Sequence, residues 1–272
     1  MKQENLIVEF YNGMKRKVRV LLPKDYKSSG RKYPALYMFD GQNVFSQRES
    51  CTGVTWGVKE AMEELLSKGL IEPMVVIAFD HADEMRMSEY SPFNLTLGEQ
   101  EVEGEGAIFS EFMIRKLIPW LEEKYPLKAE PSARALAGSS MGGLMTAYTA
   151  MKHPGVFSSF GIFSLCSWIN REAFAGFFKK NPVECDCRFF VQVGTREGLN
   201  ADTGEEDLQV SEAYLKDSLD FVDALLETGV DEGNIMLIQG EGDWHSEIVW
   251  RRHMPGFLLW LRNQGSDLEQ AL

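Results

Sequence analysis

The sequence has few cysteines and no long apolar run. Four cysteines in 272 residues are too few for the disulfide framework of a chain of this size. Cys185 and Cys187 are separated by one residue, a spacing unlike the paired ligands of a structural zinc site. We therefore expect free thiols and no bound metal. Because no stretch of about 18 apolar residues occurs, we also expect no membrane-spanning helix.

Basic residues are outnumbered by acidic ones. The chain has 28 Lys and Arg against 41 Asp and Glu, a formal net charge of −13, and its basic residues form only short pieces such as Lys15-Arg16-Lys17. This balance disfavours binding to nucleic acid and to anionic membranes. The opening residues, MKQENLIVEF, lack the apolar core and cleavage site of a signal peptide. We expect a cytoplasmic protein.

Strand-like and helix-like segments alternate along the chain. Apolar runs predict strands at 5–10, 16–22, 35–39, 74–79, 133–138, 157–163, 188–194 and 234–240. Helical patterns occur at about 54–67, 107–124, 141–152, 170–178, 208–228 and 246–262.

This order predicts an α/β protein. The Asn12-Gly13 pair favours a hairpin between the first two strands. Alternation from the third strand onward predicts parallel strands joined by helical crossovers. We expect a single domain over residues 1–272, with a mostly parallel sheet of about eight strands, an antiparallel N-terminal hairpin and helices on both faces. Residues 80–106 form the longest irregular segment, and such segments tend to be functional.

A serine lies between glycines where a predicted strand meets a predicted helix. The stretch ALAGSSMGGLM contains G-x-S-x-G, with Ser140 at its centre. A serine on a sharp strand-to-helix turn is exposed at the sheet edge, and the flanking glycines permit a strained backbone. Ser140 is thus the candidate nucleophile. Ser139, at the x position, is expected to point elsewhere, and a purely structural turn is the alternative.

A serine hydroxyl needs a base, and histidine is the usual one. Of the four histidines, His245 follows the last predicted strand in the glycine-rich loop GEGDWH. Parallel sheets bind ligands at this carboxyl edge, so His245 is the predicted base. His81 could belong to a pocket wall, His153 could cap a helix end and His253 falls inside the last helix.

A carboxylate should orient the histidine and stabilise its charged form. In hydrolases of this strand–turn–helix architecture, the chain order of the three residues is serine, acid, histidine. Glu197 follows the strand 188–194 closely, which fixes its geometry, and Asp202 is the reserve candidate. The oxyanion formed on attack needs backbone N–H donors. We assign these to Met141, directly after the nucleophile, and to Gln42 in the loop after the third strand.

Several motifs together resemble the "Putative esterase" family of α/β-hydrolases, which includes enterochelin-esterase-like proteins, feruloyl esterase domains and antigen 85 mycolyltransferases. The resemblance covers about residues 15–262 and rests on KYPALYMFDGQNVF, Thr55-Trp56, Arg86 with Glu89-Tyr90-Ser91-Pro92, AGSSMGGL, GTREG, and His245 with Trp250.

The resemblance implies an α/β-hydrolase fold and a Ser140, Glu197 and His245 triad, with Gln42 and Met141 as oxyanion donors. Many family members have Asp at the acid position, whereas antigen 85-like members have Glu, as here. The resemblance implies a small-molecule ester substrate and no cofactor. It permits siderophore lactones, feruloyl or acetyl sugar esters and short acyl esters.

Five further residues are candidates for substrate binding. Asp40 and Arg86 could pair structurally, or Arg86 could meet an anionic substrate group. Trp56 and Trp168 could be core aromatics or pocket wall, and Tyr90 completes this group. The leading hypothesis is a serine carboxylic-ester hydrolase. An acyltransferase with the same triad and a catalytically silent binding protein of this fold are the alternatives.

Overall fold

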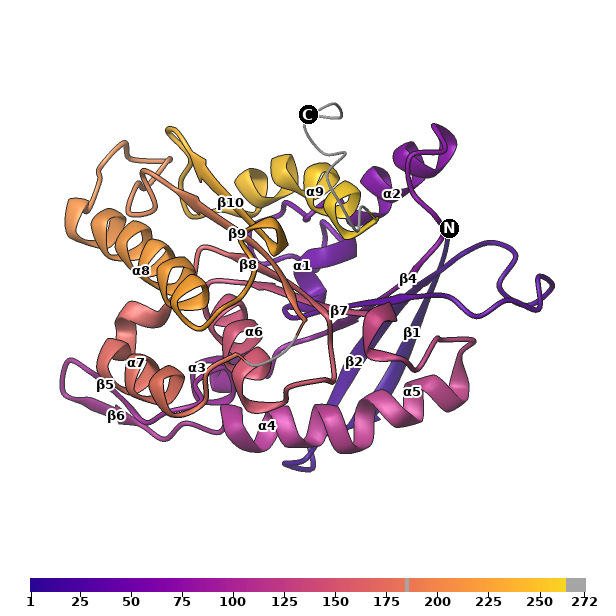
Figure 1. The fold of residues 1–272 in the computed structure, drawn as a ribbon, viewed down its shortest axis with the longest axis horizontal. Helices are drawn as coiled ribbons and strands as arrows, with labels where there is room; N and C mark the ends of the chain where they lie inside the picture. The colour runs from indigo at the N-terminus through magenta and orange to yellow at the C-terminus, as the bar shows by residue number, and fades with distance from the viewer. Residues whose placement is uncertain (184–185, 263–272) are drawn as a thin grey trace.

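The computed structural model describes residues 1–183 and 186–262, and its centre is one eight-stranded sheet (Figure 1). The spatial order is β1-β2-β4-β3-β7-β8-β9-β10. Only β2 runs against its neighbours, because it pairs antiparallel with both β1 and β4 while all other pairs are parallel. The strands are β1 (Lys2–Glu9), β2 (Lys15–Leu22), β3 (Ala35–Met38), β4 (Val75–Phe79), β7 (Arg134–Ser139), β8 (Ser159–Phe163), β9 (Arg188–Gly194) and β10 (Ile235–Gly240).

The predicted sheet is confirmed, including its N-terminal hairpin. Each of the eight expected strands is present, with ends displaced by at most three residues. In the turn between β1 and β2, Phe10 N–H donates to the Met14 carbonyl at 2.9 Å. Because all crossovers from β3 onward are parallel, the carboxyl ends of β3, β7, β8, β9 and β10 meet at one edge of the sheet.

Helices cover both faces of the sheet, as expected (Figure 1). Alternate side chains of a strand point to opposite faces, so Tyr37 and Leu36 belong to two separate cores. One core is covered by α1 (Gly41–Phe45), α2 (Val58–Ser67) and α9 (Glu247–Arg262). The other is covered by α4 (Gly106–Phe112), α5 (Ile118–Lys124), α6 (Met141–Lys152), α7 (Arg171–Lys180) and α8 (Leu208–Glu227), with the π-helical turn η2 (Met113–Leu117) joining α4 to α5.

Residues 80–106 are more regular than expected. They form η1 (Asp83–Met85), α3 (Arg86–Glu89) and a small hairpin of β5 (Leu95–Leu97) and β6 (Gln100–Val102). An ion pair between buried Arg16 and buried Glu89 ties this segment to β2. Tyr90 is fully buried and its ring stacks on Phe109 of α4. These buried contacts order the segment in spite of its polar sequence. The remaining short helices are η3 (Pro131–Ala133), η4 (Ser167–Asn170) and η5 (Glu232–Asn234).

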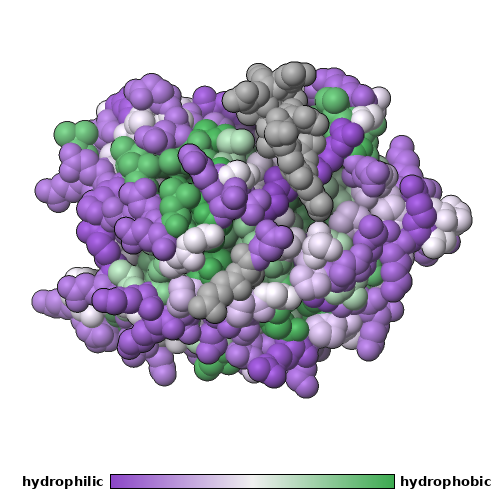
Figure 2. All heavy atoms as spheres, viewed as in Figure 1, coloured by the Kyte–Doolittle hydropathy of each residue, from purple (hydrophilic) through white to green (hydrophobic). Residues whose placement is uncertain are grey.

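The expectation of four free thiols is wrong for Cys187, which is disulfide-bonded. Cys51 and Cys166 are free, and Cys185 lies outside the described residues. Within the described part of the chain, no helix combines the length and apolar character needed to cross a bilayer. Polar and charged side chains cover most of the face in Figure 2, and apolar side chains gather on it between α8 and β10.

Candidate active site

Ser140 lies on a strained turn between β7 and α6. Its backbone has φ 56° and ψ −123°, a region that L-residues rarely adopt, and its N–H donates to the Phe163 carbonyl at 2.9 Å. A Cβ added at Gly138 would lie only 2.5 Å from the backbone of Gly142, so the close approach of strand and helix requires a glycine there. Ser139 is buried, whereas Ser140 is partly exposed at the carboxyl edge of the sheet.

His245 and Glu197 are in direct contact. His245 Nδ1 lies 2.8 Å from Glu197 Oε2, and the Glu197 side chain has no exposed surface. The other carboxylate oxygen, Oε1, accepts from Gly194 N–H and Ser164 Oγ, both at 2.7 Å. Asp202, the reserve acid, is exposed in the loop after β9, where its backbone N–H donates to Asn200. The structure thus brings Glu197 to His245 and leaves Asp202 in solvent.

The loops that carry Glu197 and His245 are joined by backbone contacts. Thr195 N–H donates to the Gly240 carbonyl at 3.0 Å, and Thr195 Oγ1 accepts from Gly242 N–H at 2.9 Å. Asp243 packs so tightly on the strand end that a Cβ at Gly240 would lie 1.9 Å from its carboxylate. This packing explains the glycines and the threonine of the two loops: they let Glu197 and His245 approach each other.

The other three histidines have different partners. His253 Nε2 lies 2.6 Å from Asp243 Oδ2, and His153 Nε2 lies 3.1 Å from Ser110 Oγ. His81 Nδ1 accepts from Asp83 N–H at 2.9 Å. Burial lowers the pKa of both His81 and His153. Of the four histidines, His245 is the one in contact with Glu197.

Gln42 and Met141 begin neighbouring helices. Met141 is the first residue of α6 and Gln42 the second of α1, where backbone N–H groups have no partner inside the helix. Both residues are buried. The turn before α1 is held by Asp40, whose φ is 54° and whose N–H donates to the hydroxyl of Tyr90 at 3.1 Å. A Cβ added at Gly142, directly after Met141, would lie 3.3 Å from Asp40 Oδ2, so the start of α6 lies close to the turn before α1.

The five candidates for substrate binding occupy different places. Asp40 accepts two hydrogen bonds from Arg86, at 2.7 and 2.9 Å, so these two residues pair. Tyr90 is completely buried beneath them. Trp56 is 2% exposed in the core, with its ring centroid 5.0 Å from Phe163 and 5.4 Å from Trp250. Trp168 is partly exposed and its ring meets Tyr214 edge-on at 5.6 Å.

Sequence reasoning missed Tyr214, which comes from α8. Its hydroxyl lies 3.4 Å from Ser140 Oγ, and its ring centroid lies 4.8 Å from that of His245. It also donates to Cys166 Sγ at 3.4 Å. Among the described residues, Ser140 Oγ has its hydrogen bond with Tyr214 and none with His245. No local motif marks Tyr214. The helical spacing of apolar residues in 208–228 shows only that its side chain faces the protein interior.

Sequence reasoning also missed Ser164, which follows β8. Its Oγ donates to Glu197 Oε1 at 2.7 Å and accepts from Trp250 Nε1 at 2.9 Å. The residue has φ 49° and no exposed surface. It lies after β8, the strand between β7, which precedes Ser140, and β9, which precedes Glu197.

Replacing Ser164 with Ala is expected to lower the free energy of unfolding by about 1–3 kcal/mol, because Trp250 Nε1 loses its partner inside the core. We expect kcat to fall as well, because Glu197 loses one of its two fixing donors. Denaturant titration and ester turnover measure both effects. Ser218→Ala is the matched control, since Ser218 is equally buried and its hydroxyl has no hydrogen-bond partner in the described ranges of the chain. If Ser218→Ala lowered the free energy of unfolding and kcat as much as Ser164→Ala does, the role assigned to Ser164 would be contradicted.

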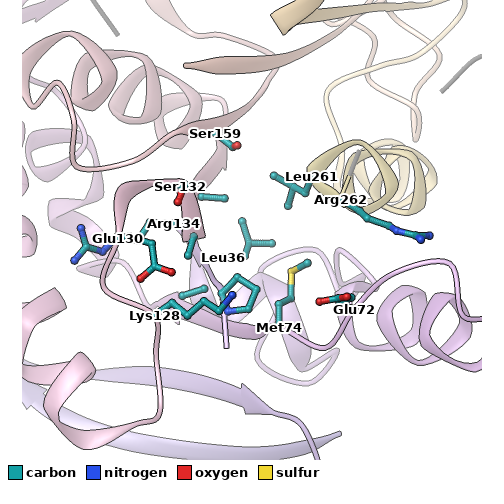
Figure 3. Close-up of a pocket in the computed structure, with 14 residues that line it drawn as sticks. Leu36, Glu72, Met74, Lys128, Glu130, Ser132, Arg134, Ser159, Leu261 and Arg262 are labelled. Carbon is teal, nitrogen blue, oxygen red and sulfur yellow. The ribbon is translucent and has the colours of Figure 1, made fainter. Parts of the chain in front are cut away.

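A cavity of about 420 Å³ lies at the opposite edge of the sheet (Figure 3). It is lined by residues at the amino ends of β3, β7 and β8, including Leu36, Arg134 and Ser159. It is therefore separate from Ser140. Within the described ranges, no group of three or more His, Cys, Asp or Glu side chains is arranged to hold a metal ion.

Known proteins share this sequence pattern and fold. A family model described as "Putative esterase" matches residues 11–261. The uncharacterised Bacillus subtilis (strain 168) protein YbbA is 24% identical over 249 residues, which cover 90% of this chain and 92% of YbbA. Esterase Rv1288 of Mycobacterium tuberculosis (strain ATCC 25618 / H37Rv) is 33% identical over 142 residues, covering 52% of this chain and 27% of the relative. This chain therefore aligns with only about a quarter of the length of Rv1288.

A solved structure shows the same fold. The IroE-like serine hydrolase from Shewanella oneidensis superposes with a TM-score of 0.74 at 18% identity, over 96% of this chain and 80% of the other. The match of the family model extends over nearly the whole sequence and includes the turn at Ser140 and the loops that carry Glu197 and His245. The chain belongs to the family described as "Putative esterase" and is a carboxylic ester hydrolase with an α/β-hydrolase-like fold.

Proposed function

We propose that the chain hydrolyses carboxylic esters through a triad of Ser140, His245 and Glu197 and an acyl-enzyme intermediate. The observation that carries the proposal is the contact between His245 and a fully buried Glu197, at the same sheet edge as a strained Ser140. A carboxylate on Nδ1 holds the imidazole with Nε2 free to accept a proton. His245 can then serve as base for a hydroxyl that is otherwise a weak nucleophile.

The proposed reaction has two halves. In acylation, Ser140 Oγ attacks the ester carbonyl while His245 accepts its proton, and the charge on the carbonyl oxygen is stabilised by the N–H groups of Gln42 and Met141. His245 then donates the proton to the departing alcohol. In deacylation, water attacks the acyl group, His245 accepts a proton from it, and Ser140 Oγ leaves as a hydroxyl. The Glu197 carboxylate stabilises the imidazolium in both halves.

The substrate is proposed to be a small-molecule ester. Arg86 stays partly exposed in its pair with Asp40, which lies in the turn before α1; we call residues 40–42 the oxyanion turn. Trp168 and Tyr214 form an aromatic wall near Ser140. We also propose that residues 1–272 form one domain, because strands from both ends of the described chain share one sheet. The cytoplasmic location stays a prediction from the sequence.

An organophosphonate ester is expected to inactivate the protein by labelling Ser140 alone, because only a serine with an activated hydroxyl attacks phosphorus. Peptide mass spectrometry locates the adduct. An adduct on another serine would contradict the assignment of the nucleophile.

Adding a good acceptor alcohol to the ester assay distinguishes a hydrolase from an acyltransferase. A product formed mainly by transfer to millimolar alcohol would favour the acyltransferase. A screen of p-nitrophenyl, feruloyl and catecholate esters tests the third alternative, because no turnover of any of them would favour the catalytically silent protein.

A further inference from the structure

The Tyr214 hydroxyl is within hydrogen-bond distance of the proposed nucleophile. It lies 3.4 Å from Ser140 Oγ and 3.4 Å from Cys166 Sγ. The phenol is 5% exposed and reaches the site from α8, a helix that contributes none of the three proposed triad residues. Its ring also lies against His245, with centroids 4.8 Å apart, and against Trp168 at 5.6 Å.

The two partners of the Tyr214 hydroxyl differ in strength as acceptors. A phenol has one hydrogen to donate, and a thiol sulfur is a weak acceptor for it. In the resting arrangement that hydrogen points to Cys166, so the phenol oxygen is free to accept from Ser140 Oγ–H. When negative charge develops on Ser140 Oγ, the phenol hydrogen can turn from the sulfur to that oxygen, because a charged acceptor forms the stronger bond. Losing the hydrogen bond to Cys166 Sγ costs little free energy, because sulfur is a weak acceptor.

We propose that Tyr214 is a catalytic residue that acts mainly in deacylation, by donating a hydrogen bond to Ser140 Oγ as that oxygen leaves the acyl group. The proposal rests on the acyl-enzyme mechanism above. Water adds to the acyl carbon and gives a proton to His245; the bond between the acyl carbon and Oγ then breaks, and Oγ takes the proton back from His245. The phenol donates a hydrogen bond during the bond breaking and keeps its own proton.

The effect on the two halves of the reaction is unequal. Before acylation, Ser140 is a hydroxyl already bonded to Tyr214, so the phenol stabilises the ground state as well as the transition state. In the acyl-enzyme, Oγ is an ester oxygen and a poor acceptor, so the phenol stabilises the transition state for its departure much more than the ground state. Only an interaction that strengthens in the transition state accelerates a step. Deacylation should therefore depend on the hydroxyl more than acylation does.

Tyr214→Phe tests this proposal, because the change removes the hydroxyl and keeps the ring against His245. With p-nitrophenyl acetate we expect deacylation to slow by about 10- to 100-fold, the value of one hydrogen bond to a charged group. The variant should show a burst of p-nitrophenol equal to the enzyme concentration, with kcat and KM falling together and kcat/KM little changed. Mass spectrometry should find the acetyl group accumulating on Ser140.

Tyr37→Phe is the matched control, since Tyr37 is fully buried in the core and its hydroxyl has no hydrogen-bond partner among the described residues. That variant should behave as the unmodified protein in every assay. For Tyr214→Phe, an unchanged kcat, or a lower kcat/KM without a burst, would overturn the proposal. Both results differ from failure of the acyl-enzyme mechanism itself, in which Ser140→Ala would retain turnover.

The pH dependence gives a second readout. Burial raises the pKa of the Tyr214 phenol well above its ordinary value, so the group stays protonated through the alkaline assay range. The titratable groups that face it are Cys166, Glu197 and His245. Burial raises the pKa of the Cys166 thiol to about 11, so the sulfur stays neutral as well. The ratio of deacylation rates between the unmodified protein and Tyr214→Phe should therefore stay constant from about pH 7 to pH 9. A ratio that falls to one within this range would contradict a protonated donor.

Discussion

Ser140→Ala is expected to lower kcat for ester hydrolysis by about 10⁴-fold or more, because the three residues of a catalytic triad act as a unit. The fold should be retained. Ser140 precedes α6, but within the described part of the chain its side chain makes no capping hydrogen bond, so removing the hydroxyl takes no cap from the helix. The strained φ of 56° is as available to alanine as to serine. Circular dichroism, thermal unfolding and turnover of p-nitrophenyl acetate measure these effects.

Ser139→Ala is the matched control for this change. Ser139 is the preceding residue in the chain, at the end of β7, and is 3% exposed. Its alanine variant should keep most of the activity. A large loss in Ser139→Ala together with an active Ser140→Ala would move the nucleophile by one residue. A loss in both variants together with a lower midpoint of thermal unfolding would indicate damage to the turn and would require the phosphonate label to decide.

Glu197→Gln is expected to lower kcat by about 10³- to 10⁴-fold. The carboxylate lies 2.8 Å from His245 Nδ1. An amide NH₂ in that place favours the imidazole tautomer with its proton on Nε2, which cannot accept the proton of Ser140. It also removes the negative charge that stabilises the imidazolium. Steady-state kinetics with a neutral ester measures the loss.

Asp202→Asn separates the two carboxylates proposed for the acid position. Asp202 is exposed in the loop after β9, so its amide variant should change kcat by no more than about twofold, as expected for a surface substitution. Equal small losses in Glu197→Gln and Asp202→Asn would mean that Ser140 and His245 act without a carboxylate. A larger loss in the Asp202 variant would contradict the geometry described here.

The sheet could be predicted from the sequence because each strand is short, apolar and bounded by turn residues. The turn at Ser140 could be predicted for the same local reason: glycines, strand and helix adjoin each other in the sequence. The elements that were missed have weak local signals. Helix α1 has five residues and begins after a left-handed Asp40, and the β5–β6 hairpin has three residues in each strand. Both depend on contacts with distant parts of the chain.

The supporting residues of the site could not be predicted for a different reason. Tyr214 and Ser140 are 74 positions apart, and Ser164 and Trp250 are 86 apart, so only the folded chain brings them together. Ser164 follows an ordinary apolar strand, and nothing near it in the sequence indicates a partner for Glu197. Local reasoning could propose the reacting groups, because chemistry dictates their residue types. It could not find the side chains that hold them, since many residue types can fill that role.

The order of the strands separates the proposed reacting groups from the segment 80–106. Ser140, Glu197 and His245 follow β7, β9 and β10, with Ser164 after the intervening β8, so these groups come from one contiguous block of the sheet. The segment 80–106 contributes Arg86 and Tyr90 to the turn at Asp40 and none of those three residues. Insertions and exchanges there can remodel the surroundings of the oxyanion turn while the proton-transfer groups keep their spacing. Changes in residues 80–106, whether designed or evolved, can therefore alter which substrate binds and leave the proposed reacting groups in place.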